Sequence, residues 1–213
     1  MKIERPLYQK LNSIADWIIR VVVTNVLVIV TLLPIVTWYA ALSAGFNVFS
    51  DYLAKDEENI FKRFLEHFRA QLPKRMLIGA VVILSVLFVS YNMLYYEEIL
   101  TSNGHPFYTV GYYAMFSLVI IILVLTLQSF AVLRVYPNAS FRTTFRLSFF
   151  FSGKYFIRTF LLIATWTLPV FLFFTPFLMT VFFLTGVGLP LLLQALIEIP
   201  VLQGLRELGD RHD

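Results

Sequence analysis

The chain contains the uninterrupted apolar run Val119-Ile120-Ile121-Ile122-Leu123-Val124-Leu125. It lies inside a longer apolar stretch, residues 107–133, and comparable stretches cover residues 18–50, 76–96, 155–175 and 177–197. Each is near or above the roughly 20 residues that a helix needs to cross the hydrocarbon core of a bilayer. A transmembrane β-strand would alternate apolar and polar side chains, and this run does not. The sequence therefore predicts an all-α, polytopic membrane protein.

Composition supports this class. Of the 213 residues, 59% are hydrophobic and only 14% are charged, too few polar side chains to cover a soluble globule of this size. Because the chain has no cysteine, it offers no disulfide framework, thiolate nucleophile or cysteine-based metal site. We expect residues 1–213 to form a single transmembrane domain.

The distribution of basic residues predicts the topology, since Lys and Arg in short loops stay on the cytoplasmic side during insertion. The segments 1–20, 54–75 and 134–158 hold four, six and five of the 17 basic residues, whereas the connections at 97–106 and around Thr175-Pro176 hold none. All 17 lie inside if the chain crosses six times, with both termini cytoplasmic. The predicted spans are 17–33, 35–53, 76–96, 110–133, 155–175 and 177–197.

The six-span interpretation depends on a break at Pro34. Proline removes a backbone donor and disfavours helical geometry in the preceding Leu33. The two resulting spans are short, so a re-entrant hairpin entering from the cytoplasmic side, or one long kinked helix with five spans in total, remain alternatives.

Residues 56–72 have the pattern of an amphipathic helix that forms an elbow between two spans. The apolar residues Ile60, Phe61, Phe64, Leu65, Phe68 and Leu72 recur at helical spacing, with Lys62, Arg63 and Arg69 on the other face. A second basic elbow, with Arg142 and Arg146, lies 80 residues later and suggests a repeated unit of span, elbow and span. Each elbow is a candidate surface for anionic lipid or for a cytoplasmic partner protein.

Few polar residues interrupt the spans. Asn25, Asn47, Asn92 and Gln128 are candidates to line a transport cavity, although amides in spans more often bridge helices. Glu198 is the one acid in a late apolar run, and we expect it at the cytoplasmic interface, near headgroups or Arg206. The small residues Ala40, Ala41, Ala44 and Gly45 predict close helix packing, either within the chain or between two copies.

No enzymatic constellation emerges. Gly153-Lys154 lacks the remainder of a phosphate-binding loop, and His67, His105 and His212 are too far apart to form one metal site in the predicted topology. We therefore predict no catalytic residues, no cofactor, no metal and no nucleic-acid partner.

The order of features resembles the YesL-like family of bacterial membrane proteins. The residues that carry the resemblance are Pro34, Thr37, Ala40, Ala41 and Ala44, then Asp56-Glu57-Glu58, and the spaced Phe61, Phe64 and Phe68. The similarity covers residues 5–80 well and residues 130–160 more loosely. It implies a domain of unknown function in a bacterial plasma membrane, often associated with carbohydrate uptake, and it supplies no catalytic residues. The motif positions are expected to be structural.

Two hypotheses follow. The first is a non-enzymatic accessory or regulatory protein linked to carbohydrate uptake, in contact with subunits of an ABC-type sugar transporter. The alternative is a small autonomous transporter. A homo-oligomer is compatible with either.

Overall fold

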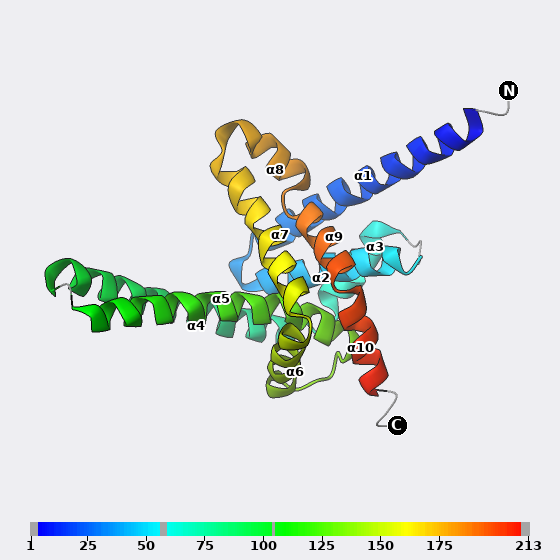
Figure 1. The fold of residues 1–213 in the computed structure, drawn as a ribbon. Coiled ribbons are helices and arrows are strands. Elements are labelled where there is room, and N and C mark those ends of the chain that lie inside the picture. The colour runs from blue at the N-terminus through cyan, green and yellow to red at the C-terminus, as the bar shows by residue number, and fades with distance from the viewer. Residues whose placement is uncertain (1–3, 56–58, 104, 210–213) are drawn as a thin grey trace. The chain divides into compact units, whose positions relative to one another are not determined.

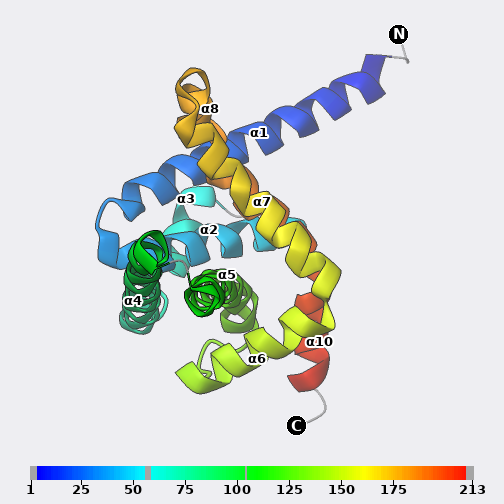
Figure 2. The same ribbon diagram turned by 60° about the vertical axis from the view of Figure 1, so that its left-hand side comes forward.

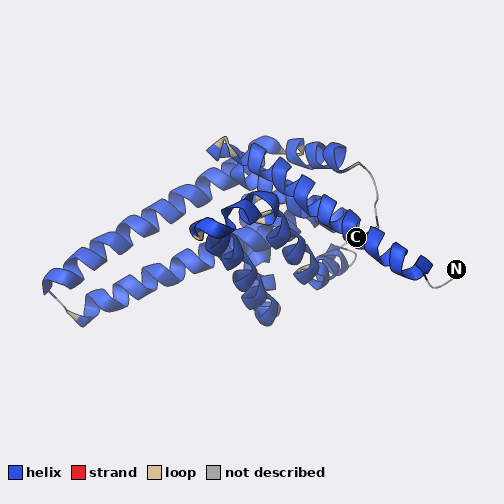
Figure 3. Ribbon diagram, turned by 90° about the horizontal axis from the view of Figure 1, so that it is seen from above, coloured by secondary structure: helices blue, strands red, loops and turns tan. Residues whose placement is uncertain are grey.

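The computed structural model describes residues 4–55, 59–103 and 105–209, with only the backbone described for residues 4–11 and 103. All regular structure in these ranges is helical (Figure 3). The all-α prediction is confirmed.

The helices belong to two compact units that interleave along the sequence (Figure 1). Unit 1 comprises residues 1–72 and 161–199, and unit 2 comprises residues 73–160 and 200–213. Unit 1 contains α1 (Glu4–Leu32), η1 (Ile35–Thr37), α2 (Trp38–Leu53), α3 (Ile60–Arg69), η2 (Pro176–Leu178), α8 (Met179–Thr185) and α9 (Gly188–Ile197). Unit 2 contains α4 (Leu72–Asn103), α5 (Pro106–Val135), α6 (Phe141–Lys154) and α10 (Ile199–Gly209), and α7 (Phe156–Phe174) passes from unit 2 into unit 1.

Helix α2 is the core of unit 1. Every residue from Tyr39 to Ser50 is buried, and α2 packs against α1, α3 and α9 (Figure 2). Ala40, Ala41 and Ala44 have no exposed surface. A Cβ atom at Gly45 would lie 2.7 Å from Leu191 Cδ1 and 2.8 Å from Val28 Cγ2. The absence of a Cβ atom at Gly45 therefore lets α1 and α9 approach α2 closely.

The predicted break at Pro34 is present. Helix α1 ends at Leu32 and α2 begins at Trp38, with the short η1 between them, so one continuous kinked helix is ruled out. The Pro34 carbonyl oxygen accepts from the Thr37 N–H at 2.9 Å. The Thr37 hydroxyl lies 2.6 Å from the Thr31 carbonyl oxygen and 2.7 Å from that of Pro34, so its single proton serves a carbonyl at the break. Leu33 and Ile35 are 77% and 74% exposed at this turn, as expected for a turn that meets lipid rather than water.

Four helical segments are long and apolar enough to cross a membrane: Asn12–Leu32, Leu72–Ser102, Pro106–Val135 and Phe156–Phe174. A fifth candidate is the pair Pro176–Thr185 and Gly188–Ile197, which bends by 59°. These segments coincide with five of the six predicted spans. The remaining one, 35–53, corresponds to α2, whose 16 residues extend about 24 Å, short of the roughly 30 Å hydrocarbon core.

Unit 2 is built on the long antiparallel hairpin of α4 and α5 (Figures 1 and 3). The first half of α5 exposes large apolar side chains such as Val110, Phe116 and Ile121, whereas its second half, from Gln128 to Leu133, is buried. Helix α6 packs on α5. So large an exposed apolar surface is typical of a helix that meets lipid or another protein.

We predict that Gly188→Ala destabilises the protein. The new Cβ atom would lie 2.7 Å from the Val21 carbonyl oxygen and 2.9 Å from Asn25 Cβ, so the backbones of α1 and α9 would have to separate. We expect a loss of about 1–3 kcal/mol in the free energy of unfolding, measured by thermal unfolding in detergent. Gly153→Ala in α6 is the control, because its Cβ meets nothing within 4 Å and alanine favours the helix. Equal stability of the two variants would contradict the proposed close contact between α1 and α9 at Gly188.

Candidate functional site

The first candidate site is the elbow helix α3, which lies within the range 56–72 predicted to be amphipathic. Its apolar face packs inward, against α1 and α2. Phe64 is fully buried and its ring stacks on that of Phe68, with centroids 6.2 Å apart. Phe64 is therefore part of the packing of unit 1 and is not available as an anchor for a partner.

Polar contacts fix α3 further. His67 Nε2 lies 2.6 Å from Asp51 Oδ2 on α2, and the Asn59 side chain caps the helix by accepting from the Phe61 N–H at 3.0 Å. The acidic residues Asp56, Glu57 and Glu58, expected in the first turn, lie outside the described residues. The cap closes the start of α3, and the His67–Asp51 pair holds the helix to α2.

The outward face of α3 carries more basic than acidic side chains, and its acid, Glu66, lies 3.9 Å from Lys62 Nζ. Lys62 and Arg69 are exposed, and Phe61 is 56% exposed beside them. Arg63 is less accessible and lies 3.6 Å from Glu66, an exposed ion pair of small energetic weight. Of the residues proposed for this surface, Lys62 and Arg69 are the ones presented outward. Because α3 packs on α1 and α2, the positions of Lys62 and Arg69 on its outward face are fixed as well.

The second elbow is α6, in unit 2. Its N-terminus is capped by Ser140, which accepts from the Thr143 N–H at 3.2 Å, and Arg142 and Arg146 are exposed. Like α3 on α2, it packs on the helix that precedes it. The shared order of buried helix and basic elbow accords with the suggested repeat.

Asn25 joins three segments of unit 1. It is fully buried on α1; its Oδ1 accepts from the backbone N–H groups of Val187 and Gly188, each at 2.8 Å, and its Nδ2 donates to the Phe183 carbonyl oxygen at 2.6 Å. These are groups that the break between α8 and α9 leaves without helical partners. Asn25 thus has a structural role and is not free to bind a solute.

A second buried polar chain in unit 1 runs from Trp166 through Gln194 to Glu198. Trp166 Nε1 donates to Gln194 Oε1 at 2.9 Å, and Gln194 Nε2 donates to Glu198 Oε1 at 3.1 Å. Glu198 is completely buried, and its Oε2 has no hydrogen-bond partner among the described residues. We expected this side chain near headgroups or Arg206, whereas it is enclosed within the protein just after the last residue of α9.

The remaining candidates do not converge. Asn47 and Gln128 are buried in different units, and the Asn92 amide donates to the Phe88 carbonyl of its own helix at 2.7 Å. Among the described residues, no group of three or more His, Asp or Glu side chains could hold a metal ion, and His212 lies outside them.

These features are typical of a polytopic helical membrane protein. They are the apolar helices of membrane-spanning length, the exposed apolar surface, and the helix breaks whose backbone groups bond to side chains of the protein. Residues 21–93 match the family described as "Protein of unknown function, DUF624", to which YesL-like proteins belong, so the resemblance seen in the sequence is confirmed. The match begins within α1, includes α2 and α3 and ends within α4. Comparison with curated proteins and with solved structures gives no match.

We predict that Asn25→Leu costs about 3 kcal/mol or more of unfolding free energy, because it leaves two N–H groups and a carbonyl without partners in a buried site. Asn92→Leu is the matched control, since it removes one bond within a single helix. Thermal unfolding of both variants in the same detergent measures the difference. If Asn25→Leu lost no more unfolding free energy than Asn92→Leu, the hydrogen bonds of Asn25 to the α8–α9 break would be dispensable for stability.

Proposed function

We propose that the chain is a non-enzymatic accessory or regulatory protein of the bacterial plasma membrane, linked to carbohydrate uptake. The observation that carries the proposal is the construction of α3. Phe64 and Phe68 pack inside unit 1, whereas the basic side chains and the exposed ring of Phe61 are presented outward.

Such a face suits an acidic, partly apolar protein surface. Lys62 and Arg69 supply charge that steers and orients a partner, and Phe61 supplies an aromatic anchor, the residue type enriched where proteins bind. The partner that we propose is a subunit of an ABC-type sugar transporter, which follows from the family association. A rigid docking helix without a catalytic constellation fits an accessory role.

The proposed topology has six spans and cytoplasmic termini, which places both elbows on the cytoplasmic side. It is supported by the basic elbows and by the exposed apolar turn at Pro34. In this arrangement α2 crosses or re-enters the membrane surrounded by other helices. It can therefore be shorter than the hydrocarbon core is thick.

The test is affinity purification of the tagged full chain from native membranes in mild detergent, followed by mass spectrometry. We expect transporter permeases or their ATPase in stoichiometric amounts. The double variant Lys62→Glu and Arg69→Glu is expected to reduce their recovery at least about tenfold, because like charges across an interface cost several kcal/mol. Its unfolding free energy should change by less than about 1 kcal/mol, since exposed ion pairs contribute little.

The control is Arg142→Glu with Arg146→Glu, the same charge change on the other elbow, which should leave recovery unchanged. Equal losses in the two double variants would mean that net charge, and not the α3 surface, governs association. Recovery of the wild-type chain without transporter subunits would contradict the proposal.

The alternative function, a small autonomous transporter, is favoured by one observation, the buried Glu198 with an unpartnered carboxyl oxygen beside a bent helix pair. Acids buried in membrane proteins commonly take part in proton or cation pathways. The purified chain in liposomes would then take up a solute, and Glu198→Gln would reduce uptake to background without loss of fold. Glu207→Gln, on the exposed side of α10, is the control. Absence of flux across a panel of sugars, amino acids and cations would remove this alternative.

A further inference from the structure

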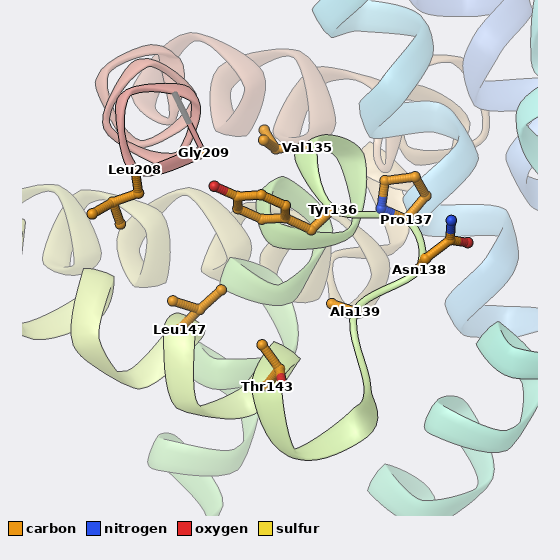
Figure 4. A pocket seen from close by; sticks show the side chains of 9 residues that line it. All are labelled: Val135, Tyr136, Pro137, Asn138, Ala139, Thr143, Leu147, Leu208 and Gly209. Carbon is orange, nitrogen blue, oxygen red and sulfur yellow. The ribbon is translucent and has the colours of Figure 1, made fainter. Parts of the chain in front are cut away.

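A pocket of about 680 Å³ lies within unit 2, between the end of α5, the following linker, α6 and the last turn of α10 (Figure 4). This volume is within the range of about 300–1,000 Å³ usual for ligand sites. The lining is mostly apolar and comprises Val135, Tyr136, Pro137, Ala139, Leu147 and Leu208, with Asn138, Thr143 and Gly209 at its edges. Figure 4 shows Thr143 and Leu147 projecting from α6 on one side, and Leu208 and the Tyr136 ring facing them on the other.

The walls of the pocket are fixed by contacts across unit 2. The Tyr136 hydroxyl donates to the Leu205 carbonyl oxygen at 2.6 Å, which joins the end of α5 to α10. Lys74 Nζ donates to the carbonyl oxygens of Pro137 and Ala139 at 2.6 and 2.5 Å, which pins the linker. A site held in place before binding loses less entropy when a ligand enters.

Two arginines of α6 are the sequence neighbours of pocket-lining residues. Arg142 and Arg146 precede the lining residues Thr143 and Leu147 on α6, and both are exposed. Within the described residues, neither makes an ion pair or a hydrogen bond through its side chain. Helix α6 contains three basic residues and no acid. An apolar pocket on a helix that also exposes two arginines, each next to a lining residue, is complementary to an amphiphile with an anionic head.

The position of the pocket along α5 indicates where such an amphiphile comes from. The 30 residues of α5 extend about 45 Å, whereas the hydrocarbon core is about 30 Å thick. The end of a crossing α5 therefore projects into the headgroup layer, and the pocket lies at this end.

We propose that this pocket is a binding site for an anionic phospholipid, with its phosphate at Arg142 and Arg146 and part of an acyl chain against Tyr136, Leu147 and Leu208. The guanidinium groups select the charge of the headgroup, since Arg matches phosphate oxygens in bidentate geometry. The apolar wall distinguishes a lipid from a free phosphate ion.

The test is native mass spectrometry of the full-length chain in detergent, titrated with phosphatidylglycerol, with phosphatidylcholine of the same acyl chains, and with glycerol phosphate. We expect a saturable one-to-one adduct with phosphatidylglycerol, weaker binding of phosphatidylcholine, and no adduct with glycerol phosphate. Arg142→Gln with Arg146→Gln should weaken phosphatidylglycerol binding about 30-fold, from the contribution of each basic residue near an anionic headgroup.

Leu147→Trp fills the pocket while leaving both arginines, and it should abolish the adduct. Thr143→Phe, at a more exposed edge, serves the same purpose if the tryptophan variant does not fold, which circular dichroism would show. Lys62→Gln with Arg69→Gln is the matched control and should leave binding unchanged. Equal binding of the two lipids, an adduct with glycerol phosphate alone, or full binding by folded pocket-filling variants would each overturn the proposal.

Discussion

The structure depends on satisfying backbone hydrogen bonds where helices break in the absence of water. A lipid-exposed carbonyl or N–H group has no solvent partner, so each break must be closed from within the protein. Asn25 does this between α8 and α9, with one amide that serves three backbone groups. Thr37 does it at the Pro34 turn. The bent helix pair and the α1–α2 hairpin can therefore exist in an apolar environment.

Close packing around α2 follows from the same requirement. With lipid as solvent, apolar side chains gain little by leaving it, and association relies on contact between closely spaced backbones. The alanines of α2, Gly45 and Gly188 provide that spacing, and the family match includes α2 itself. The motif positions Ala40, Ala41, Ala44 and Phe64 are all buried in the packing of unit 1. No ligand-contacting role is needed to account for their burial.

The two elbow helices, α3 and α6, occupy similar positions after a packed helix but have different neighbours. Each packs on the preceding helix and presents basic residues outward, in separate units of the chain. Helix α3 buries Phe64, whereas α6 buries Thr144, Ser148 and Phe151. In α3 the outward face is a bare helix surface with an aromatic ring, which suits a protein. In α6 it borders a pocket formed with the α5–α6 linker and α10, which suits a lipid.

The sequence by itself determined the all-helical class with its long apolar helices, the break at Pro34 and the family resemblance over residues 21–93, because hydrophobic length, proline geometry and short motifs are local properties. Only the tertiary structure decided that Phe64 faces inward, that Asn25 closes a break more than 150 residues away, that Glu198 is buried, and that a pocket forms beside α6. Each of these depends on contacts between segments distant in sequence, and a residue's type does not specify which distant backbone it will meet.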